Sequence, residues 1–578
     1  MSRQRLERSG SPCLRTQPAD FAPPFAAKDY VKKPDGPADL RIECGVAIVG
    51  GGPAGMACAV RLGQLLGDDP ATLERLGEVP LIVLEKGRAP GSHALSGAIV
   101  NPSALRELFP GTPLEQLPTY GPVTGEAVYF MTRGRAQRLP TPPPFHNKGN
   151  WIFSLSRLTR WMGERAEELG AFVQPETTAL RLLVADGAVR GVQTAPMGLD
   201  RAGTAPPGAA PPTEIVAQAT VLAEGTQGHL RGVALDHFEV GSRFPQAYEI
   251  GVKEIWKVSK PLDRIMHTLG WPLRWSARYG EVGGSFIYPM GPDHICIGFV
   301  VGLEYADSGL SPHDVLQQFK THPFIRRLLD GAERVAWGAK TIPSGGFHSI
   351  PDTLALPGAV LTGDSAGLVN IPRLKGVHYA MHSGILAAEA IHRGLQAGAD
   401  LAEPGALAPY DAAVRASRIG KDLHRYRNMR QALSRGLVVG GQLAGIMDAT
   451  RGVFPGGAWG QRDDAEVEMR PLGRTPVEPD GVVTFDKLSS VFLSGNRTRD
   501  DQPNHIRIRS RVPLEVARTW VNMCPATVYE IVEGSETGDG QVRVQMAPSN
   551  CVQCGAITAK GGRLTPPEGG SGPEYTLM

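Results

Sequence analysis

Three cysteines near the C-terminal end of the chain have the residue type and part of the spacing of a metal or cluster site. Cys551 and Cys554 form a C-x-x-C pair, and Cys524 precedes them in the segment CPATVYEI. Thiolate pairs at this spacing are typical of iron-sulfur and zinc sites, and cluster-binding segments often supply another cysteine three residues later. Ile557 stands at that position, and an aliphatic side chain cannot ligate iron. The pattern therefore predicts a metal site that is either altered or degenerate.

A glycine-rich turn near the N-terminal end has the spacing of a dinucleotide-binding site. Residues 45–62 read GVAIVGGGPAGMACAVRL, an apolar strand followed by a glycine motif and an alanine-rich helix. Gly50 permits the tight turn, Gly52 lets backbone amides approach a pyrophosphate, and Gly55 allows the helix to pack closely on the strand. A second apolar strand, PLIVLEKG, ends in Glu85, which is placed to hydrogen-bond a ribose hydroxyl.

Two later strand-turn-helix segments predict that the dinucleotide is FAD. ATVLAEGTQGHLR ends a strand beside Gly225, and GAVLTGDSAGLVNIPRLKG turns at Gly363 and Asp364 before a long helix. Three such segments in this order are typical of large FAD-dependent oxidoreductases, in which the acid after the last strand bonds the ribityl or phosphate region. Asp364 is the acid expected to do so. The sequence has no second glycine-rich fingerprint for a nicotinamide cofactor.

The size and composition of the chain limit its possible functions. It has 578 residues, a formal net charge of +2 and seven cysteines. This length predicts several domains, and the absence of a polybasic block argues against nucleic-acid binding. Cysteines this sparse do not form a disulfide framework, and they favour a reducing compartment.

Residues 1–40 are expected to form a flexible tail. They lack the apolar region of a secretory signal, and prolines and Asp20 argue against the amphipathic helix of a transit peptide. Nowhere are there about 18 consecutive apolar residues, the minimum for a membrane-spanning helix. Residues 436–447 are apolar apart from Gln442 and are flanked by arginines. This segment suits either a helix that dips into a membrane interface or an ordinary buried helix.

Other segments predict the elements that must position these residues. SLSRLTRWMGERAEELG has apolar residues at helical spacing and predicts a core-facing helix, and ALRLLVADGAVRGVQT predicts a hairpin that turns at Asp186 and Gly187. Residues 241–340 contain alternating, aromatic-rich strands such as GGSFIYPM and HICIGFVVGL. These strands suit a β-rich lobe inserted into the FAD-binding fold.

From about residue 40 to the C-terminus, the chain resembles the electron-transfer flavoprotein:ubiquinone oxidoreductase family, whose members pass electrons from soluble electron-transfer flavoprotein to membrane quinone. The resemblance is carried by many separate segments, which no single general fold motif would produce. Among these segments are HALSGAIVNPSALRELFP, HNKGNWIFSLSRL, EIGVKEIW, TLGWPL, GGSFIYPM, GFVVGLEY, THPFIR, PRLKGVHYAMHSGILAAEAI, DKLSSVFLS, DQPNHI, CPATVYEI and PEGGSGPEY.

The resemblance implies three domains after the tail. The FAD-binding domain takes residues 41–240 and 341–470, with 436–447 at the membrane surface. The quinone-binding domain takes residues 241–340, and a ferredoxin-like iron-sulfur domain takes residues 471–578. The implied fold class is α/β plus α+β, in which a β-rich lobe interrupts a Rossmann-like domain.

The resemblance also implies ligands, partners and location. The cofactors would be FAD and a four-iron, four-sulfur cluster, the donor electron-transfer flavoprotein, and the acceptor ubiquinone or a related quinone. The protein would attach to one membrane surface, facing the bacterial cytoplasm or the mitochondrial matrix. Gly283 and Gly284 match a glycine pair at the family's quinone pocket, although such glycines more often mark a bulge. Asp364 replaces a family cysteine and fits the wider flavoprotein pattern.

The cysteine set departs from the family, because Cys524, Cys551 and Cys554 match three cluster ligands and Ile557 occupies the position of the fourth. A three-iron cluster, a four-iron cluster with a non-cysteine ligand, a zinc site and a relic are the alternatives. Zinc would need another ligand such as His505, which no spacing brings near the cysteines. We favour a bound but altered cluster, because three thiolates supply most of the ligand field.

The leading functional prediction is a quinone oxidoreductase in which FAD accepts electrons from a protein donor. Flavin suits this reaction because it exchanges one or two electrons, so no acid-base residue need be catalytic. One alternative is an FAD-dependent reductase or hydroxylase of a lipid-like substrate, which predicts NAD(P)H oxidation. The other is a clusterless paralogue whose C-terminal tail docks a partner.

Overall fold

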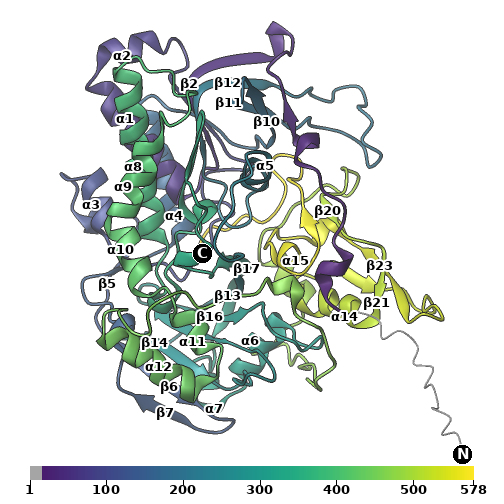
Figure 1. Ribbon diagram of the computed structural model, residues 1–578. Helices are drawn as coiled ribbons and strands as arrows, with labels where there is room; N and C mark the ends of the chain where they lie inside the picture. The colour runs from purple at the N-terminus through teal and green to yellow at the C-terminus, as the bar shows by residue number, and fades with distance from the viewer. Residues whose placement is uncertain (1–15) are drawn as a thin grey trace, which may run out of the picture.

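The computed structural model describes residues 16–578 of the chain. A nine-stranded sheet with its helices, a seven-stranded sheet and a C-terminal unit pack against one another (Figure 1). The chain end returns to the centre of the molecule (Figure 1), where the Ser156 amide donates to the main-chain oxygen of Met578 at 2.9 Å.

Residues 16–40 are ordered and do not form the expected flexible tail. Strand β1 (Val31–Lys32) pairs in parallel with β10 (Ala179–Ala185) at the edge of the nine-stranded sheet. Lys32 also forms an ion pair with the buried Glu214, with Nζ and Oε1 2.8 Å apart. The prediction for residues 1–15 lies outside the described residues. Short helices complete the segment, namely η1 (Pro18–Phe21), η2 (Ala27–Tyr30) and η3 (Ala38–Leu40).

The centre of the nine-stranded sheet is parallel. Its parallel strands are β9 (Phe172–Gln174), β3 (Leu81–Leu84), β2 (Arg41–Val49), β12 (Glu214–Leu222) and β19 (Ala359–Leu361). Strand β2 is buried from Cys44 to Val49, as expected for a central parallel strand. Helix α1 (Pro53–Gly67) packs on both α8 (Val377–Gln396) and α4 (Leu155–Glu168) (Figure 1).

The predicted hairpin and core-facing helix are both present. Strand β10 pairs with β11 (Ala188–Thr194), and Asp186 and Gly187 have φ angles of 53° and 74°, as in a type I′ turn. In α4, Leu155, Leu158 and Met162 are buried, whereas Leu169 caps the helix and is 38% exposed.

The inserted lobe is a seven-stranded sheet. Its strand order is β17 (Glu333–Pro343), β13 (Tyr248–Lys257), β16 (His294–Gly302), β15 (Gly283–Pro289), β14 (Ile265–Gly270), β6 (Glu126–Met131) and β7 (Ala136–Leu139). The last two strands come from before residue 241, so the lobe is larger than the range 241–340. Strand β6 pairs in parallel with β14 and satisfies backbone groups that would otherwise form an open edge.

The two faces of this sheet differ because side chains alternate along each strand. Ile250, Val252 and Trp256 of β13 enter the core of the lobe, against which α6 (Pro312–Lys320) packs. Gly251 and Lys253 lie on the opposite face, where Lys253 Nζ donates to the Ser96 carbonyl at 2.9 Å. We call this second face, which looks toward the nine-stranded sheet, the pocket face.

The C-terminal unit has one three-stranded and one two-stranded sheet with short helices. Tyr575 joins it to the pocket face, since its hydroxyl oxygen accepts a hydrogen bond from the Ala339 amide at 3.2 Å. The elements are α13 (Lys487–Phe492), β20 (Ile506–Arg507), β21 (Arg511–Pro513), α14 (Leu514–Met523), β22 (Tyr529–Ile531), β23 (Gln541–Met546), α15 (Ala556–Ala559) and β24 (Arg563–Leu564).

Candidate functional site

A cavity of about 360 Å³ lies where the two large sheets and the C-terminal unit meet. Its wall is built from the glycine turn after β2, the pocket face, the start of α8 and parts of residues 553–567. We call this space the larger cavity. It brings together residues from segments that are hundreds of positions apart in the sequence.

The glycine turn has the geometry that its motif predicts. Gly50 has a φ of 107°, and a Cβ there would lie 2.5 Å from the Ala223 carbonyl oxygen. A Cβ on Gly52 would meet no atom of residues 16–578 within 4 Å, so the N-terminus of α1 faces free space in this part of the chain. Gly55 lies behind the turn, where a Cβ would be 2.0 Å from the Gly50 carbonyl oxygen. Free amides at a helix N-terminus favour a bound phosphate group.

Glu85 stabilises the same turn from the end of β3. Its carboxylate accepts hydrogen bonds from the Gly51 amide at 2.8 Å and the Gly87 amide at 2.6 Å. Burial raises the pKa of Glu85, and the Gly87 amide and Lys86 oppose that rise. Glu85 lines the larger cavity, as its predicted contact with a ribose requires.

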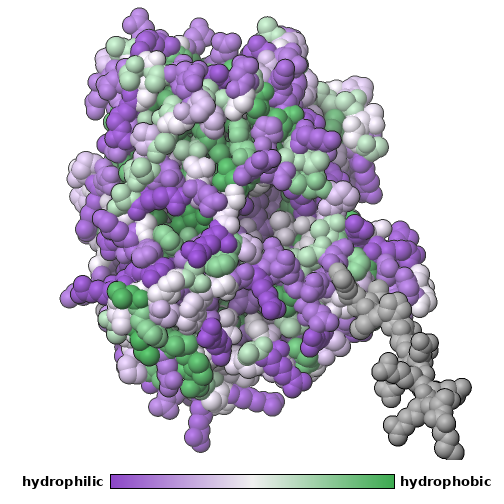
Figure 2. Space-filling model, in the orientation of Figure 1, coloured by the Kyte–Doolittle hydropathy of each residue, from purple (hydrophilic) through white to green (hydrophobic). Residues whose placement is uncertain are grey.

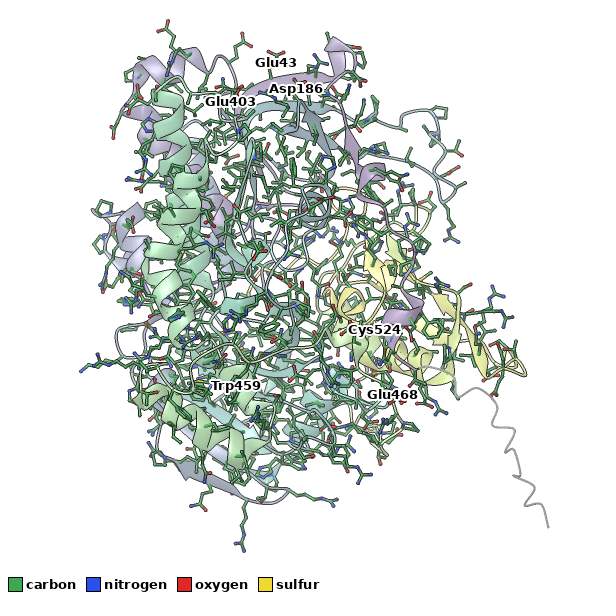
Figure 3. All side chains as sticks on the ribbon, viewed as in Figure 1. Glu43, Asp186, Glu403, Trp459, Glu468 and Cys524 are labelled. Atoms are coloured by element: carbon green, nitrogen blue, oxygen red, sulfur yellow. The ribbon has the colours of Figure 1, made fainter. Side chains whose placement is uncertain are left out.

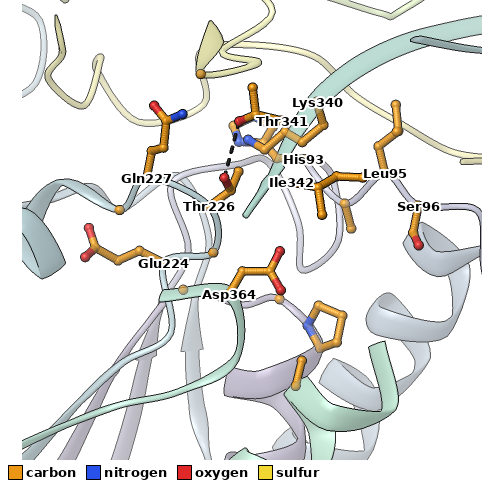
Figure 4. A pocket seen from close by; sticks show the side chains of 18 of the residues that line it. His93, Leu95, Ser96, Glu224, Thr226, Gln227, Lys340, Thr341, Ile342 and Asp364 are labelled. Atoms are coloured by element: carbon orange, nitrogen blue, oxygen red, sulfur yellow. Dashed lines mark hydrogen bonds between the residues drawn. The ribbon is translucent and has the colours of Figure 1, made fainter. Parts of the chain in front are cut away.

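Asp364 and Gly225 line the larger cavity, whereas Gly363 lies just behind it. Gly363 has a φ of 57°, and its amide donates to Ser383 Oγ at 2.9 Å. Burial raises the pKa of Asp364 to about 6, and the nearby Lys340 opposes the rise. In Figure 4 Asp364 lies near the middle of the view, below Thr341 of β17 and Thr226, which follows β12.

Glu224 has a local structural role. Its carboxylate accepts hydrogen bonds from the amides of Leu230 at 3.0 Å and Arg231 at 2.6 Å. It therefore caps α5 (His229–His237), and its carboxylate points away from Asp364 in Figure 4. Above it, the hydroxyls of Thr226 and Thr341 lie 3.3 Å apart.

Buried polar atoms in the cavity wall lack partners within residues 16–578. They are both amide atoms of Gln227, Nδ1 of His93, Nδ1 of His267, both ring nitrogens of His505 and Oγ1 of Thr362. Buried polar groups are normally hydrogen-bonded, so these atoms are the ones that a polar ligand would satisfy. Together with the free space at α1, they make the cavity suitable for a dinucleotide such as FAD.

The two glycines predicted at the quinone site lie next to the wall of the larger cavity. Gly284 pairs with Val300 and shares the pocket face, but within the described chain neither Gly283 nor Gly284 belongs to the cavity wall. A Cβ on Gly283 would lie 2.0 Å from the Val300 carbonyl oxygen, and one on Gly284 would lie 2.6 Å from the Thr268 carbonyl oxygen. These glycines therefore allow close strand pairing, while Phe286 of the same strand reaches the cavity.

The structure brings the three predicted cysteines together around a second space, the cysteine cavity, of about 20 Å³. Cys524 lies in the C-terminal unit on the side nearer the centre of the molecule (Figure 3). Burial raises the pKa of the Cys551 and Cys554 thiols to about 12. The Gln553 amide donates to Cys551 Sγ at 3.4 Å, an N–H to sulfur contact of the kind that tunes cluster ligands. Ile557 is 3% exposed and forms part of the same wall.

The zinc interpretation does not fit this arrangement. Among residues 16–578, no three His, Cys, Asp or Glu side chains are placed to hold one metal ion. His505 instead lines the larger cavity. A cluster is not excluded by this observation, because its cysteine ligands bind different iron atoms and stand apart.

The two cavities share a wall that sequence reasoning did not identify. Gly555 lines both cavities, and Gln553 lines the larger one, so Cys554 lies directly between them. Lys86 Nζ donates to the Gln553 side-chain oxygen at 2.5 Å, and Lys340 Nζ donates to the Gln553 carbonyl at 3.1 Å. The available signals were the position of Lys86 directly after Glu85 and of Gln553 inside the C-x-x-C pair.

Comparison with known proteins identifies the family. The family model "ETF-QO, ubiquinone-binding" matches residues 248–342, and "Electron transfer flavoprotein-ubiquinone oxidoreductase, 4Fe-4S" matches residues 481–576. A mitochondrial electron transfer flavoprotein-ubiquinone oxidoreductase from Caenorhabditis elegans is 36% identical over 558 residues, covering 92% of this chain and 91% of that protein. This chain belongs to the electron transfer flavoprotein-ubiquinone oxidoreductase family. The Pseudomonas aeruginosa member is 36% identical, covering 93% of this chain and 99% of that protein.

Solved structures support the fold class of this family member. A geranylgeranyl bacteriochlorophyll reductase-like protein from Thermoplasma acidophilum aligns with a TM-score of 0.54 at 17% identity, covering 71% of this chain and 91% of that one. A flavin-dependent brominase aligns with a TM-score of 0.50 at 17% identity, covering 71% and 94%. At these identities the likeness concerns the fold alone, and it confirms the predicted Rossmann-like α/β core.

Proposed function

We propose that this chain takes electrons from reduced electron-transfer flavoprotein and passes them through FAD to ubiquinone or a related quinone. The observation that carries the proposal is the wall shared by the two cavities, in which Cys554 lies between Gln553 and Gly555. Redox groups on the two sides of such a thin wall would be close neighbours. Membership of an oxidoreductase family with this reaction supports the same conclusion.

We assign the FAD site to the larger cavity. Gly50, Gly52 and Gly55 would hold the pyrophosphate at the start of α1, and Glu85 would accept from a ribose hydroxyl. Gly225 and Asp364 would contact the ribityl side of the same ligand, and Gly363 would shape the turn that carries Asp364. When bound, FAD supplies redox chemistry in one-electron and two-electron steps.

We assign the quinone to the pocket face of the seven-stranded sheet. Phe286 and Val300 provide the apolar part of the wall there. Gly283 and Gly284 have no side chains, so the strand surface beside this wall stays low enough for a flat ring to lie against it. His267 provides a buried ring nitrogen without a partner in the described chain. A wall that is mostly apolar with few polar groups is typical of sites for small hydrophobic molecules.

We assign an iron-sulfur cluster to Cys524, Cys551 and Cys554. These thiols face one space and the amides around them point toward sulfur, which fits thiolate ligands. Ile557 lines one side of this space, and its aliphatic side chain carries no ligand atom. The cluster would therefore have three cysteine ligands instead of the four that are usual for such sites.

We also propose that α12 (Leu437–Ala449) attaches the protein to one membrane surface, facing the bacterial cytoplasm or the mitochondrial matrix. Within residues 16–578, no helix combines the length and apolar character needed to cross a bilayer. Val438, Val439 and Ile446 of α12 are 73%, 53% and 46% exposed. Figure 2 shows hydrophobic side chains gathered at the lower left, where Figure 1 places α12. An exposed apolar helix beside arginines suits the headgroup region.

The proposed function can be tested with purified, FAD-loaded protein under anaerobic conditions. Reduced electron-transfer flavoprotein should reduce the bound flavin, and a short-chain ubiquinone should then reoxidise it. Reduction by NADPH without the protein donor would instead favour a reductase or hydroxylase. Failure of both the protein donor and the quinone would indicate a paralogue that only docks a partner.

A further inference from the structure

Glu249 is a buried carboxyl group in the wall of the larger cavity. It lies on the pocket face of β13, paired with Ile342 of β17 on one side and Gly302 of β16 on the other. The residue is 5% exposed, and its carboxyl group makes no hydrogen bond or close ion pair with any residue from 16 to 578. Burying a carboxyl group without such a partner costs free energy, so its position in a pocket wall calls for a role toward a ligand.

A second carboxyl group connects this position with the protein surface. Glu304 follows β16, and its Cδ lies 3.8 Å from the Cβ position of Gly302, the strand partner of Glu249. Glu304 is paired with Arg430 of α11 (Met429–Leu433), and its side chain is 18% exposed. Arg430 also donates to the Gln461 side-chain oxygen at 3.2 Å. A carboxyl group beside Glu249 therefore touches solvent.

The surroundings of Glu249 suit a group that gains and loses protons near neutral pH. Burial raises its pKa to about 7, Arg430 lowers it and Glu304 raises it further. Two other charged groups lie nearby. Lys340 of β17 is two residues before Ile342, the strand partner of Glu249. Asp464 of η9 (Asp464–Glu466) acts electrostatically on Arg430. A carboxyl group with a pKa close to the working pH is efficient in proton transfer.

Quinone reduction requires protons as well as electrons. Each quinone takes up two electrons and two protons, and both of its carbonyl oxygens become hydroxyl groups. We propose that Glu249 gives its proton to the carbonyl oxygen nearer the pocket face, and that Glu304 returns a proton from water to Glu249. The second proton comes from water to the other carbonyl oxygen, and the two electrons would come from the reduced flavin, whose own ring proton would be released to solvent as it is oxidised. This inference rests on the proposed quinone oxidoreductase function.

The test compares Glu249→Gln with the wild type and with Glu333→Gln, which changes an exposed carboxyl group at the end of β17. Reoxidation of the reduced flavin by a short-chain ubiquinone is followed by stopped flow from pH 6 to pH 9. In the wild type the rate should fall as pH rises through the pKa of Glu249, because only the protonated carboxyl donates. Glu249→Gln should be slower by about 10²-fold and should lose this pH dependence, because general acid catalysis is worth about that much. Glu333→Gln should match the wild type.

Two further measurements separate proton donation from a structural effect. Infrared difference spectra between pH 6 and pH 8 should show a protonated-carboxyl signal in the wild type that is smaller by one group in Glu249→Gln, while the contribution of Asp364 remains. Imidazole should restore part of the lost rate in Glu249→Ala, since it is partly protonated near neutral pH, can enter the space left by the side chain and can donate in its place. Reduction of the flavin by the protein donor should be unchanged in all variants.

The possible failures are distinct. A wild-type rate and pH dependence in Glu249→Gln would overturn the role of Glu249. Lys375 also lines the cavity, and a pH dependence that is lost in Lys375→Met but kept in Glu249→Gln would overturn it too. A wild-type protein whose reduced flavin is not reoxidised by quinone would overturn the proposed function itself.

Discussion

Lys340 Nζ donates a hydrogen bond to the main-chain carbonyl of Gln553 at 3.1 Å, and this contact joins the wall of the larger cavity to the cysteine loop. Lys340 comes from β17, and Gln553 lies between the two cysteines of the C-x-x-C pair. The same ammonium group acts electrostatically on Glu85 and Asp364. One buried lysine therefore faces both the proposed flavin site and the proposed cluster site.

Removing this charge should make the flavin harder to reduce. In Lys340→Met, the midpoint potential of the bound flavin should fall by about 30 mV, equivalent to about 1.4 kcal/mol for two electrons, because a buried cation stabilises added negative charge. Spectroscopic redox titration measures this potential. Lys340→Arg keeps the charge and should stay near the wild-type value, whereas an unchanged potential in Lys340→Met would contradict the assigned FAD site.

Adding one methyl group to the glycine turn should prevent FAD binding. Gly50→Ala places a Cβ 2.5 Å from the Ala223 carbonyl oxygen at a φ of 107°, so the turn must distort, at a cost of about 1–3 kcal/mol. The FAD released per chain after denaturation should fall several-fold. Gly67→Ala, at the end of the helix that follows the turn, adds a Cβ with no neighbour within 4 Å in the described chain and should retain full FAD content.

Charges on α12 should release the protein from membranes. The variant with Val438, Val439 and Ile446 all changed to Asp loses about 1.5–3 kcal/mol of apolar burial for each side chain and adds charge to the interface. Vesicle flotation should find it in the soluble fraction. Leu73→Asp on α2 (Pro70–Arg75), at the opposite end of the molecule in Figure 1, should float like the wild type. Equal flotation of all three proteins would mean that α12 is not the membrane contact.

Restoring a thiol at residue 557 should change the cluster. Iron and acid-labile sulfide in anaerobically purified protein should indicate three iron atoms per chain or substoichiometric occupancy. Ile557→Cys should raise the iron content toward four per chain, because the new thiol enters the wall of the cysteine cavity. Ile557→Val keeps an aliphatic wall and should behave like the wild type. Iron near zero in every variant would leave FAD as the only redox centre.

Stability should depend on a buried ion triad in the inserted lobe. Glu254 Oε2 lies 2.8 Å from Lys320 Nζ, and Glu254 Oε1 lies 3.3 Å from Arg334. Burial alone would raise the pKa of Glu254, but the two cations outweigh it and the pKa is below its usual range. The unfolded chain therefore binds this proton more readily, so the stabilisation is present above about pH 4.3, the ordinary glutamate pKa, and is lost as pH falls through the lower folded value.

The matching experiment uses Glu254→Gln and thermal unfolding. At pH 7 the variant should lose about 3–5 kcal/mol of unfolding free energy, because both cations remain buried without their anion. Its melting temperature should also respond less to acid between pH 5 and pH 3 than that of the wild type. Glu333→Gln, which changes an exposed carboxyl group, should keep the wild-type acid response.

Local spacing was sufficient for part of the site. The turn formed by Gly50, Gly52 and Gly55 has the predicted geometry because its glycines act within one strand-turn-helix unit. The hairpin at Asp186 was predictable for the same reason. The spacing of the C-x-x-C pair was enough to predict that its two thiols are neighbours. It could not place Cys524, which the fold brings to the same cysteine cavity.

The sequence by itself determined the dinucleotide turn, the β-rich lobe, the cysteine set and the family, since these depend on neighbouring residues or on many matching segments. Only the tertiary structure decided that residues 16–40 are ordered, that β6 and β7 complete the lobe, and that one wall separates the two cavities. It also decided that the Glu249 carboxyl group lies in the cavity wall without a partner among residues 16–578. These features arise from strand pairing and packing between distant segments, and the energies that select such contacts depend on which surfaces meet rather than on any local pattern.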